Sequence, residues 1–190
     1  ATDHDKVISA TAGVYDGSFE LASISSNGFS GARASTYCWY GTSVTLRDQG
    51  ERRASDGYYA GGAHVGDLPS AADVARVALD RALSRLGSEK GPTAKTTMVV
   101  DSRAAGQLIG RLLGAASARR VQQGQSFWAD LVGKKAFSDR LTIVDDPLIP
   151  RGFGSRHFDD EGISARTIPI IENGEVLNLY VDTYYGRKTG

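Results

Sequence analysis

The densest group of polar side chains in the sequence lies between residues 157 and 162. It holds one imidazole and three carboxylates, followed by a glycine, and its members are His157, Asp159, Asp160, Glu161 and Gly162. Zinc takes histidine and hard cations take oxygen ligands, so a metal site is conceivable. The spacing matches neither an EF-hand loop nor the His-Glu-x-x-His of zincins. A simpler interpretation is that the carboxylates accept backbone N–H groups in a tight loop.

Other reactive residue types stand in weaker contexts. Cys38 is the lone cysteine, which excludes an intramolecular disulfide, and no histidine lies near it in sequence. A lone cysteine of this kind is usually a small buried hydrophobe rather than a nucleophile. Gly152-Phe153-Gly154 is only a Gly-x-Gly pair before an acidic stretch, which disfavours phosphate binding.

Composition and charge narrow the classes of function. The 190 residues include 22 Lys and Arg against 22 Asp and Glu, so no net field attracts nucleic acid or an anionic membrane. No stretch approaches the ~20 apolar residues of a membrane span, and we expect a cytoplasmic protein without membrane contact. The chain begins inside a β pattern and stops shortly after residues 185–188. We therefore expect it to be an internal piece of a longer protein.

The first third of the chain has a β pattern. Small, β-branched and aromatic residues dominate 7–15, 19–25 and 34–47, and they predict an antiparallel sheet over residues 6–59. Turns are expected at Asp16-Gly17, Asn27-Gly28 and Gln49-Gly50, because Gly and Asn accept the positive φ of tight hairpins.

Two main helices are expected next. Ser70 is placed to cap the first, over 70–86, with Asp73 at its third position and Gly87 as its stop. Residues 96–100 predict a short buried strand that leads into a second helix over 103–123. That helix has only a narrow polar stripe, so it should be largely buried.

The end of the chain contains the clearest hairpin. A helical turn is expected near Phe127-Trp128 and a strand at 141–144, followed by a long polar loop over 145–162. Asn173-Gly174 then separates two alternating runs, in which Ile168, Ile170, Leu177 and Leu179 should share one buried face. The predicted fold is α+β, with an antiparallel β-sheet region, two main α-helices and a C-terminal β-hairpin.

The last 40 residues carry a family resemblance. Gly154 to Gly162, Arg166-Thr167, the Glu172-Asn173-Gly174 hairpin and the run 182–188 together resemble the central block of TldD/PmbA proteins, once called modulators of DNA gyrase. The order of upstream elements is also similar. The resemblance implies that residues 1–92 are part of an N-terminal domain, that 93–190 are the central region, and that a C-terminal β-rich domain lies outside this chain.

The family has two branches, and one helix distinguishes them. TldD-like members carry His-Glu-x-x-x-His there, in which the histidines bind zinc and the glutamate is the general base. The corresponding positions here are Gly110, Arg111 and Ala115. These side chains offer zinc no ligand, and arginine is no base at neutral pH. The pattern is instead similar to the PmbA-like (TldE-like) branch.

The resemblance implies a function through a partner. We expect a non-catalytic, pseudo-enzyme subunit that pairs with a zinc-bearing TldD-like subunit acting on peptides, with no cofactor in this chain; a homo-oligomer is a further possibility. Two alternatives stay open. One is a metal-dependent hydrolase that uses residues 157–161, and the other is a regulatory protein for DNA gyrase or nucleic acid, to which the neutral charge lends no support.

Overall fold

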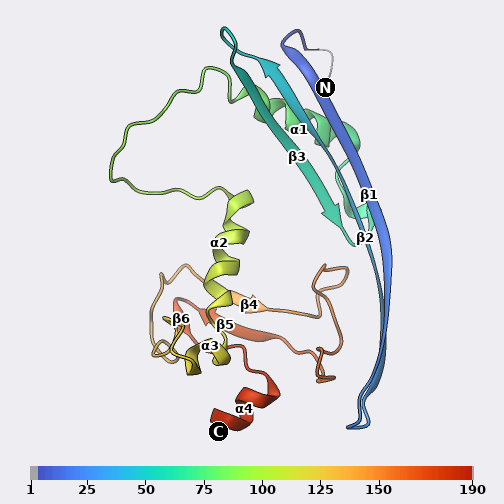
Figure 1. Ribbon diagram of the computed structural model, residues 1–190, viewed down its shortest axis with the longest axis vertical. Helices are drawn as coiled ribbons and strands as arrows, with labels where there is room; N and C mark the ends of the chain where they lie inside the picture. The colour runs from blue at the N-terminus through green and yellow to red at the C-terminus, as the bar shows by residue number, and fades with distance from the viewer. Residues whose placement is uncertain (1–3, 190) are drawn as a thin grey trace. The chain divides into compact units, whose positions relative to one another are not determined.

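The computed structural model describes residues 4–189 and divides into two compact units. The first comprises Ala1–Thr93 with the short segment Ile149–Ser155, and the second comprises Ala94–Leu148 with Arg156–Gly190. Strands come first, helices follow, and a small sheet lies near the C-terminus (Figure 1). The predicted α+β class is confirmed.

The first unit is built on a three-stranded antiparallel sheet. Its strands are β1 (Val7–Ile24), β2 (Ser30–Arg47) and β3 (Arg53–Gly62), in the order β1-β2-β3. β1 and β2 pair along almost their entire length, whereas β3 pairs with β2 only from Cys38 to Arg47. Beyond β3 the two long strands therefore continue as a two-stranded ribbon, which Figure 1 shows.

Two of the three predicted hairpin turns are confirmed and one is wrong. Gly28 (φ 91°) and Gly50 (φ 57°) lie between the strands with the positive φ that their turns require. Asp16-Gly17 instead lies in the middle of β1, where Gly17 pairs with Tyr37. The Tyr37 ring lies so close that a Cβ at position 17 would be 2.5 Å from it. This glycine thus permits close approach of a neighbouring side chain rather than a turn.

Helix α1 (Ala71–Leu83) begins at the predicted cap. The Ser70 hydroxyl accepts a hydrogen bond from Asp73 N (3.1 Å) and donates one to the Asp73 carboxylate (2.7 Å). Hydrogen bonds from Ser70 and then from Arg76 hold the pKa of Asp73 below its ordinary value. The helix ends three residues earlier than predicted, and Gly87 (φ 69°) closes the turns that follow it. A 3₁₀ turn, η1 (Val65–Asp67), lies between β3 and α1.

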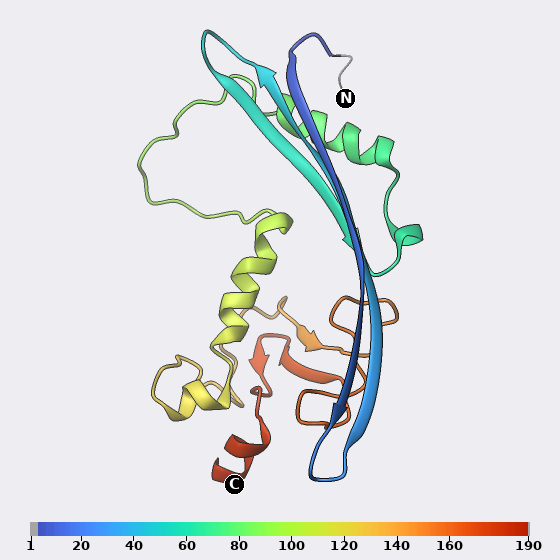
Figure 2. The same cartoon turned by 45° about the vertical axis from the view of Figure 1, so that its right-hand side comes forward.

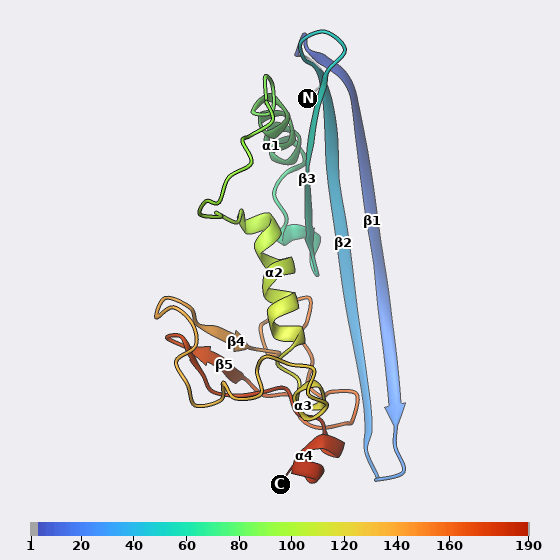
Figure 3. The same ribbon diagram turned by 60° about the vertical axis from the view of Figure 1, so that its left-hand side comes forward.

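Helix α1 covers one face of the sheet, as Figures 2 and 3 show. Alternate residues of β2 point toward it, because side chains alternate between the two faces of a strand. The buried core of the first unit consists of residues from β2, β3 and α1: Val44, Leu46, Ala54, Ala78 and Ala82.

The second predicted helix is two helices. α2 (Ser102–Gly114) and α3 (Ala118–Gln122) are separated by residues 115–117, where Ser117 forms a bridge with Tyr180. The expectation that this helix is largely buried is also wrong, since no residue of α2 is buried and Leu108 is 52% exposed. Only the end of α2 packs on a core, through Leu112 and Leu113.

The predicted buried strand over residues 96–100 is absent from the described part of the chain. These residues adopt no regular secondary structure, and Met98 and Val99 are 74% and 91% exposed. A β-type sequence forms a strand only where another strand pairs with it. No pairing partner for this segment lies among residues 4–189.

The Asn173-Gly174 hairpin is confirmed. β5 (Ile168–Glu172) and β6 (Glu175–Val176) flank the pair, whose φ values of 48° and 83° are those of a type I′ turn. β4 (Ile143–Asp145) adds a third antiparallel strand to β5. A final helix, α4 (Thr183–Thr189), follows this small sheet.

The core of the second unit surrounds Trp128, which is completely buried. Its indole N–H donates to the Leu112 carbonyl at 3.1 Å, and successive turns rather than the predicted helical turn hold residues 127–131. Ile168 and Leu179 pack against this core as predicted, while Leu177 is half-buried outside it. Its fully or almost fully buried members are Ala116, Trp128, Ile170, Ile171 and Val176.

Candidate functional site

The loop over residues 157–162 uses its carboxylates to hold backbone. Asp159 Oδ1 accepts hydrogen bonds from the N–H groups of Glu161 (2.9 Å) and Ile163 (2.8 Å). Gly162 (φ 79°) closes the same turn by donating to the Asp159 carbonyl at 3.1 Å. The position of Asp159 therefore matches the role of a loop-ordering acceptor, one of the two roles that the sequence left open.

Glu161 contacts the start of α4. Its Oε2 accepts from both the N–H and the hydroxyl of Thr183, each at 3.0 Å. A carboxylate at the N-terminus of a helix is stabilised by the free N–H groups there. His157 and Asp160 are exposed. Two of the three carboxylates are therefore occupied by backbone donors.

The positions that resemble the zinc motif lie along and beyond the end of α2. Gly110 and Arg111 are exposed, and a Cβ added at Gly110 would meet nothing within 4 Å. Ala115 is the C-cap residue of α2 and packs against the Trp128 core. Arg111 forms no ion pair with the described residues.

Within residues 4–189, no group of three or more His, Cys, Asp and Glu side chains is placed to hold a metal ion. The reason differs between the two candidate places. The α2 positions carry no donor atom for zinc, whereas in the loop the carboxylates of Asp159 and Glu161 accept hydrogen bonds from backbone N–H groups. Zinc needs three protein ligands that converge, and the residues present do not fit it.

A row of aromatic rings, which the sequence did not predict, lies on the first unit. On the face of the sheet opposite α1, three rings lie over glycines of the neighbouring strand, and a Cβ at any of these glycines would overlap the ring. The pairs are Tyr37 on Gly17, Trp39 on Gly61 and Tyr59 on Gly41. The signal in the sequence was an alternation of aromatic residues and glycines in strands that pair with one another.

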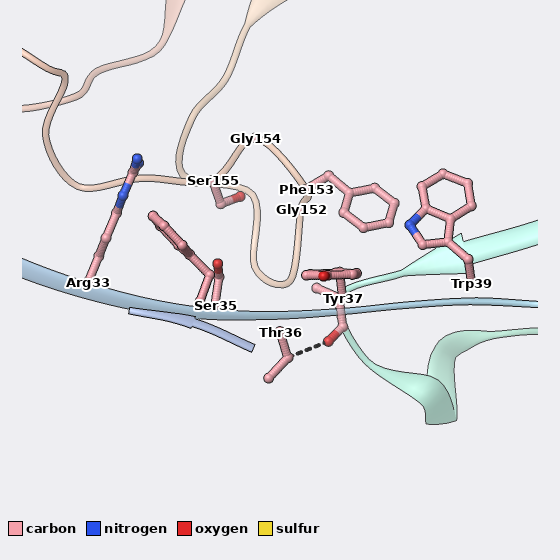
Figure 4. A pocket seen from close by; sticks show the side chains of 11 residues that line it. Arg33, Ser35, Thr36, Tyr37, Trp39, Gly152, Phe153, Gly154 and Ser155 are labelled. Carbon is pink, nitrogen blue, oxygen red and sulfur yellow. Dashed lines mark hydrogen bonds between the residues drawn. The ribbon is translucent and has the colours of Figure 1, made fainter. Parts of the chain in front are cut away.

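A cleft of about 450 Å³ opens at one end of this row (Figure 4). We call it the aromatic cleft, and its principal side chains are Phe19, Arg33, Tyr37, Trp39, Phe153 and Ser155. The rings of Trp39 and Phe153 stack with centroids 5.1 Å apart and planes 7° from parallel. The Arg33 guanidinium lies 5.9 Å from the centre of the Phe19 ring. The cleft thus combines flat apolar walls with one cationic group.

The segment Ile149–Ser155 forms one wall of the aromatic cleft. Arg151 donates from Nη1 to both carboxylate oxygens of Asp67, at 2.8 and 3.2 Å, which attaches the segment to η1. The segment closes on itself because Gly152 N donates to the Ile149 carbonyl (3.0 Å) and Ser155 N to the Gly152 carbonyl (3.1 Å). Phe153 is thereby held against Trp39.

Comparisons with known proteins identify the family to which this fold belongs. Residues 93–190 match the model of the PmbA/TldA metallopeptidase C-terminal domain, and residues 1–86 match that of the central domain of the same family. The chain belongs to the PmbA/TldA metallopeptidase family. It is 30% identical over 149 residues to the metalloprotease PmbA of Escherichia coli O157:H7, a match that covers 78% of this chain and 33% of that protein.

Solved structures of the family show the same fold. A candidate modulator of DNA gyrase from Bacteroides thetaiotaomicron is 32% identical, with a TM-score of 0.90 over 100% of this chain and 43% of its own. TldE from Thermococcus kodakarensis, at 23% identity, shares the fold with a TM-score of 0.70 over 95% of this chain and 40% of its own. The chain thus spans less than half the length of these proteins. None of the helices in the described residues is long and apolar enough to cross a membrane.

Proposed function

We propose that this chain is part of a non-catalytic subunit of a TldD/TldE-type metallopeptidase assembly. The observation that carries the proposal is the chemistry of α2 and its C-cap. Where the resemblance to TldD-like proteins expects two histidines and a glutamate, the chain has Gly110, Arg111 and Ala115. None of these can bind zinc or accept a proton from water at neutral pH.

Arg111 weighs further against a metal in this place. Its guanidinium is permanently charged and no described carboxylate neutralises it, so it repels a divalent cation. Ala115 packs in the Trp128 core, where it contributes to folding. The helix therefore supplies structure where a catalytic branch would supply ligands, and the zinc belongs to a TldD-like partner in this proposal.

The cytoplasm is the proposed compartment, and peptides or unfolded segments are the proposed substrates of the assembly. Leu108 and Ile109 of α2 are exposed apolar side chains. Their exposure supports a surface that another protein chain covers in the assembly. Relatives that are named metalloproteases support peptide hydrolysis as the activity of the assembly.

The test is a measurement of zinc and of peptide cleavage with the full-length protein, alone and mixed with a TldD-like subunit. We expect no stoichiometric zinc in the protein alone and cleavage only in the mixture. Mutation of the partner's motif glutamate should abolish that cleavage, whereas Arg111→Gln in this chain should leave it within about two-fold, because an exposed residue without contacts contributes little. Stoichiometric zinc with cleavage by this protein alone would refute the proposal.

A further inference from the structure

The aromatic cleft has the composition of a ligand site that the proposed subunit role does not use. Its volume of about 450 Å³ falls in the range of small-molecule pockets, which combine apolar walls with a few polar groups. Trp39 and Phe153 are 42% and 56% exposed although they are large aromatic side chains. Their free surfaces can take another flat apolar group.

Arg33 is the charged group of the cleft, and it lacks a counter-charge. It forms no ion pair with a described residue, and its Nε is buried without a hydrogen-bond partner. Leaving a buried donor of a charged group unpaired is unfavourable, and such a group calls for an explanation. Its contact with the Phe19 ring does not neutralise the charge. An anion bound near Arg33 would neutralise this charge.

The other side chains of the cleft favour an anion of low charge. The residues that line the cleft include no carboxylate, which would repel an anion. Ser35, two residues after Arg33 in β2, adds a hydroxyl. The guanidinium fork matches a carboxylate in two parallel hydrogen bonds. A polyanion such as nucleic acid is disfavoured because it needs several cations, whereas the cleft has one and the chain is neutral overall.

We propose that the aromatic cleft binds a carboxylate carried by an aromatic group, with the carboxylate at Arg33 and the ring against the walls made by Tyr37, Trp39 and Phe153. Figure 4 shows the arrangement: Arg33 extends from β2 at one end of the cleft, and the stacked Trp39 and Phe153 lie at the other. Two sources supply this chemistry, a free aromatic acid and the C-terminal residue of a peptide. This proposal is independent of whether the chain is catalytic.

The experiment is calorimetric titration of the intact protein with three probes. They are N-acetyltryptophan, a five-residue peptide that ends in tryptophan with a free carboxylate, and the same peptide as a C-terminal amide. We expect the free-acid peptide to bind roughly 10-fold to 100-fold more tightly than the amide, because a hydrogen bond to a charged group is lost. If N-acetyltryptophan binds with the same affinity as the free-acid peptide, the ligand is a free aromatic acid. If the peptide binds more tightly, the ligand is the C-terminal residue of a peptide.

Three variants assign the effect to residues. Arg33→Gln should remove the preference for the acid while leaving amide binding unchanged, and Phe153→Ala should weaken both peptides by roughly 2-fold to 10-fold, since it removes part of the wall. Arg47→Gln is the matched control, because Arg47 is an exposed arginine on the same strand and face. The Arg47→Gln substitution should leave the affinities for all three probes unchanged. Thermal unfolding of each variant verifies that the protein stays folded.

Several outcomes would overturn the proposal. These are equal affinity for acid and amide, an equal loss with Arg33→Gln and Arg47→Gln, no binding of the acid probes at millimolar concentration, and displacement of the bound acid by a single-stranded oligonucleotide. Zinc content and peptide cleavage do not enter this test, so its failure would leave the proposed subunit role as it stands.

Discussion

The two units of this chain form their hydrophobic cores in different ways. The first buries the alternate side chains of long strands under one helix, so its core residues recur at fixed intervals, as Val44 and Leu46 do. The second gathers short segments around Trp128: Ala116 just after α2, Ile170 and Ile171 in β5, and Val176 in β6. A periodic core is visible in a sequence, whereas a core built around one large side chain is not.

The units also differ in what they leave exposed. The first exposes aromatic rings that lie on glycines, whose positions are fixed by strand register. The second exposes Leu108 and Ile109 of α2 and residues 98–99, none of which belongs to either described core. The exposed surface of the first unit is thus ordered by its own sheet, and that of the second is not.

The largest effect should come from the residue at the centre of the second core. Trp128→Ala removes a fully buried indole and its hydrogen bond to the Leu112 carbonyl, and should cost about 4 kcal/mol of unfolding free energy. Urea unfolding measures the loss, and hydrogen exchange should show it centred on β5 and β6. Loss of protection in β2 and β3 to the same extent would contradict the division into two cores.

A smaller effect is expected in the first core. Leu46→Ala deletes a fully buried side chain between sheet and helix and should cost about 3 kcal/mol. Hydrogen exchange should locate this loss in β2, β3 and α1. Arg47→Ala, its exposed neighbour, is the control and should stay within about 0.5 kcal/mol of the parent.

The cap of α1 should have an intermediate effect with a pH dependence. Ser70→Ala removes the acceptor for Asp73 N and should cost about 1 kcal/mol near neutral pH. Because the pKa of Asp73 is lowered in the folded state, its carboxylate stabilises the fold above the ordinary pKa of 3.8, and this contribution is lost as pH falls through the folded pKa. The difference between parent and Ser70→Ala should therefore shrink below about pH 4, which urea unfolding at several pH values would show.

The smallest effect is expected on α2. Leu108→Ser replaces an exposed apolar side chain and should change the stability of this chain by less than about 0.5 kcal/mol. Leu113→Ser, on the part of the helix that packs near Trp128, should cost more than 1 kcal/mol by contrast. If Leu108→Ser also cost more than about 1 kcal/mol, α2 would be buried along its whole length, as the sequence predicted.

Much of the first unit could be predicted because its elements follow local rules. Ser70 and Asp73 form their cap within four residues, and the Asn27-Gly28 turn is held by Gly28 and by a hydrogen bond from Phe29 N to Asn27 Oδ1. The Asn173-Gly174 hairpin in the second unit follows the same rule. The exception, Asp16-Gly17, shows the limit, since the same dipeptide suits a turn and a strand that must pass beneath the Tyr37 ring.

The candidate sites divide in the same manner. Sequence alone determined that Gly110, Arg111 and Ala115 bring no zinc ligand, because donor atoms are a property of residue type. It could not decide whether Asp159 and Glu161 converge on an ion or on backbone N–H groups, since the answer depends on loop geometry. Only the tertiary structure brought Phe153 against Trp39, more than one hundred residues apart, because such contacts depend on how distant segments pack and leave no local pattern.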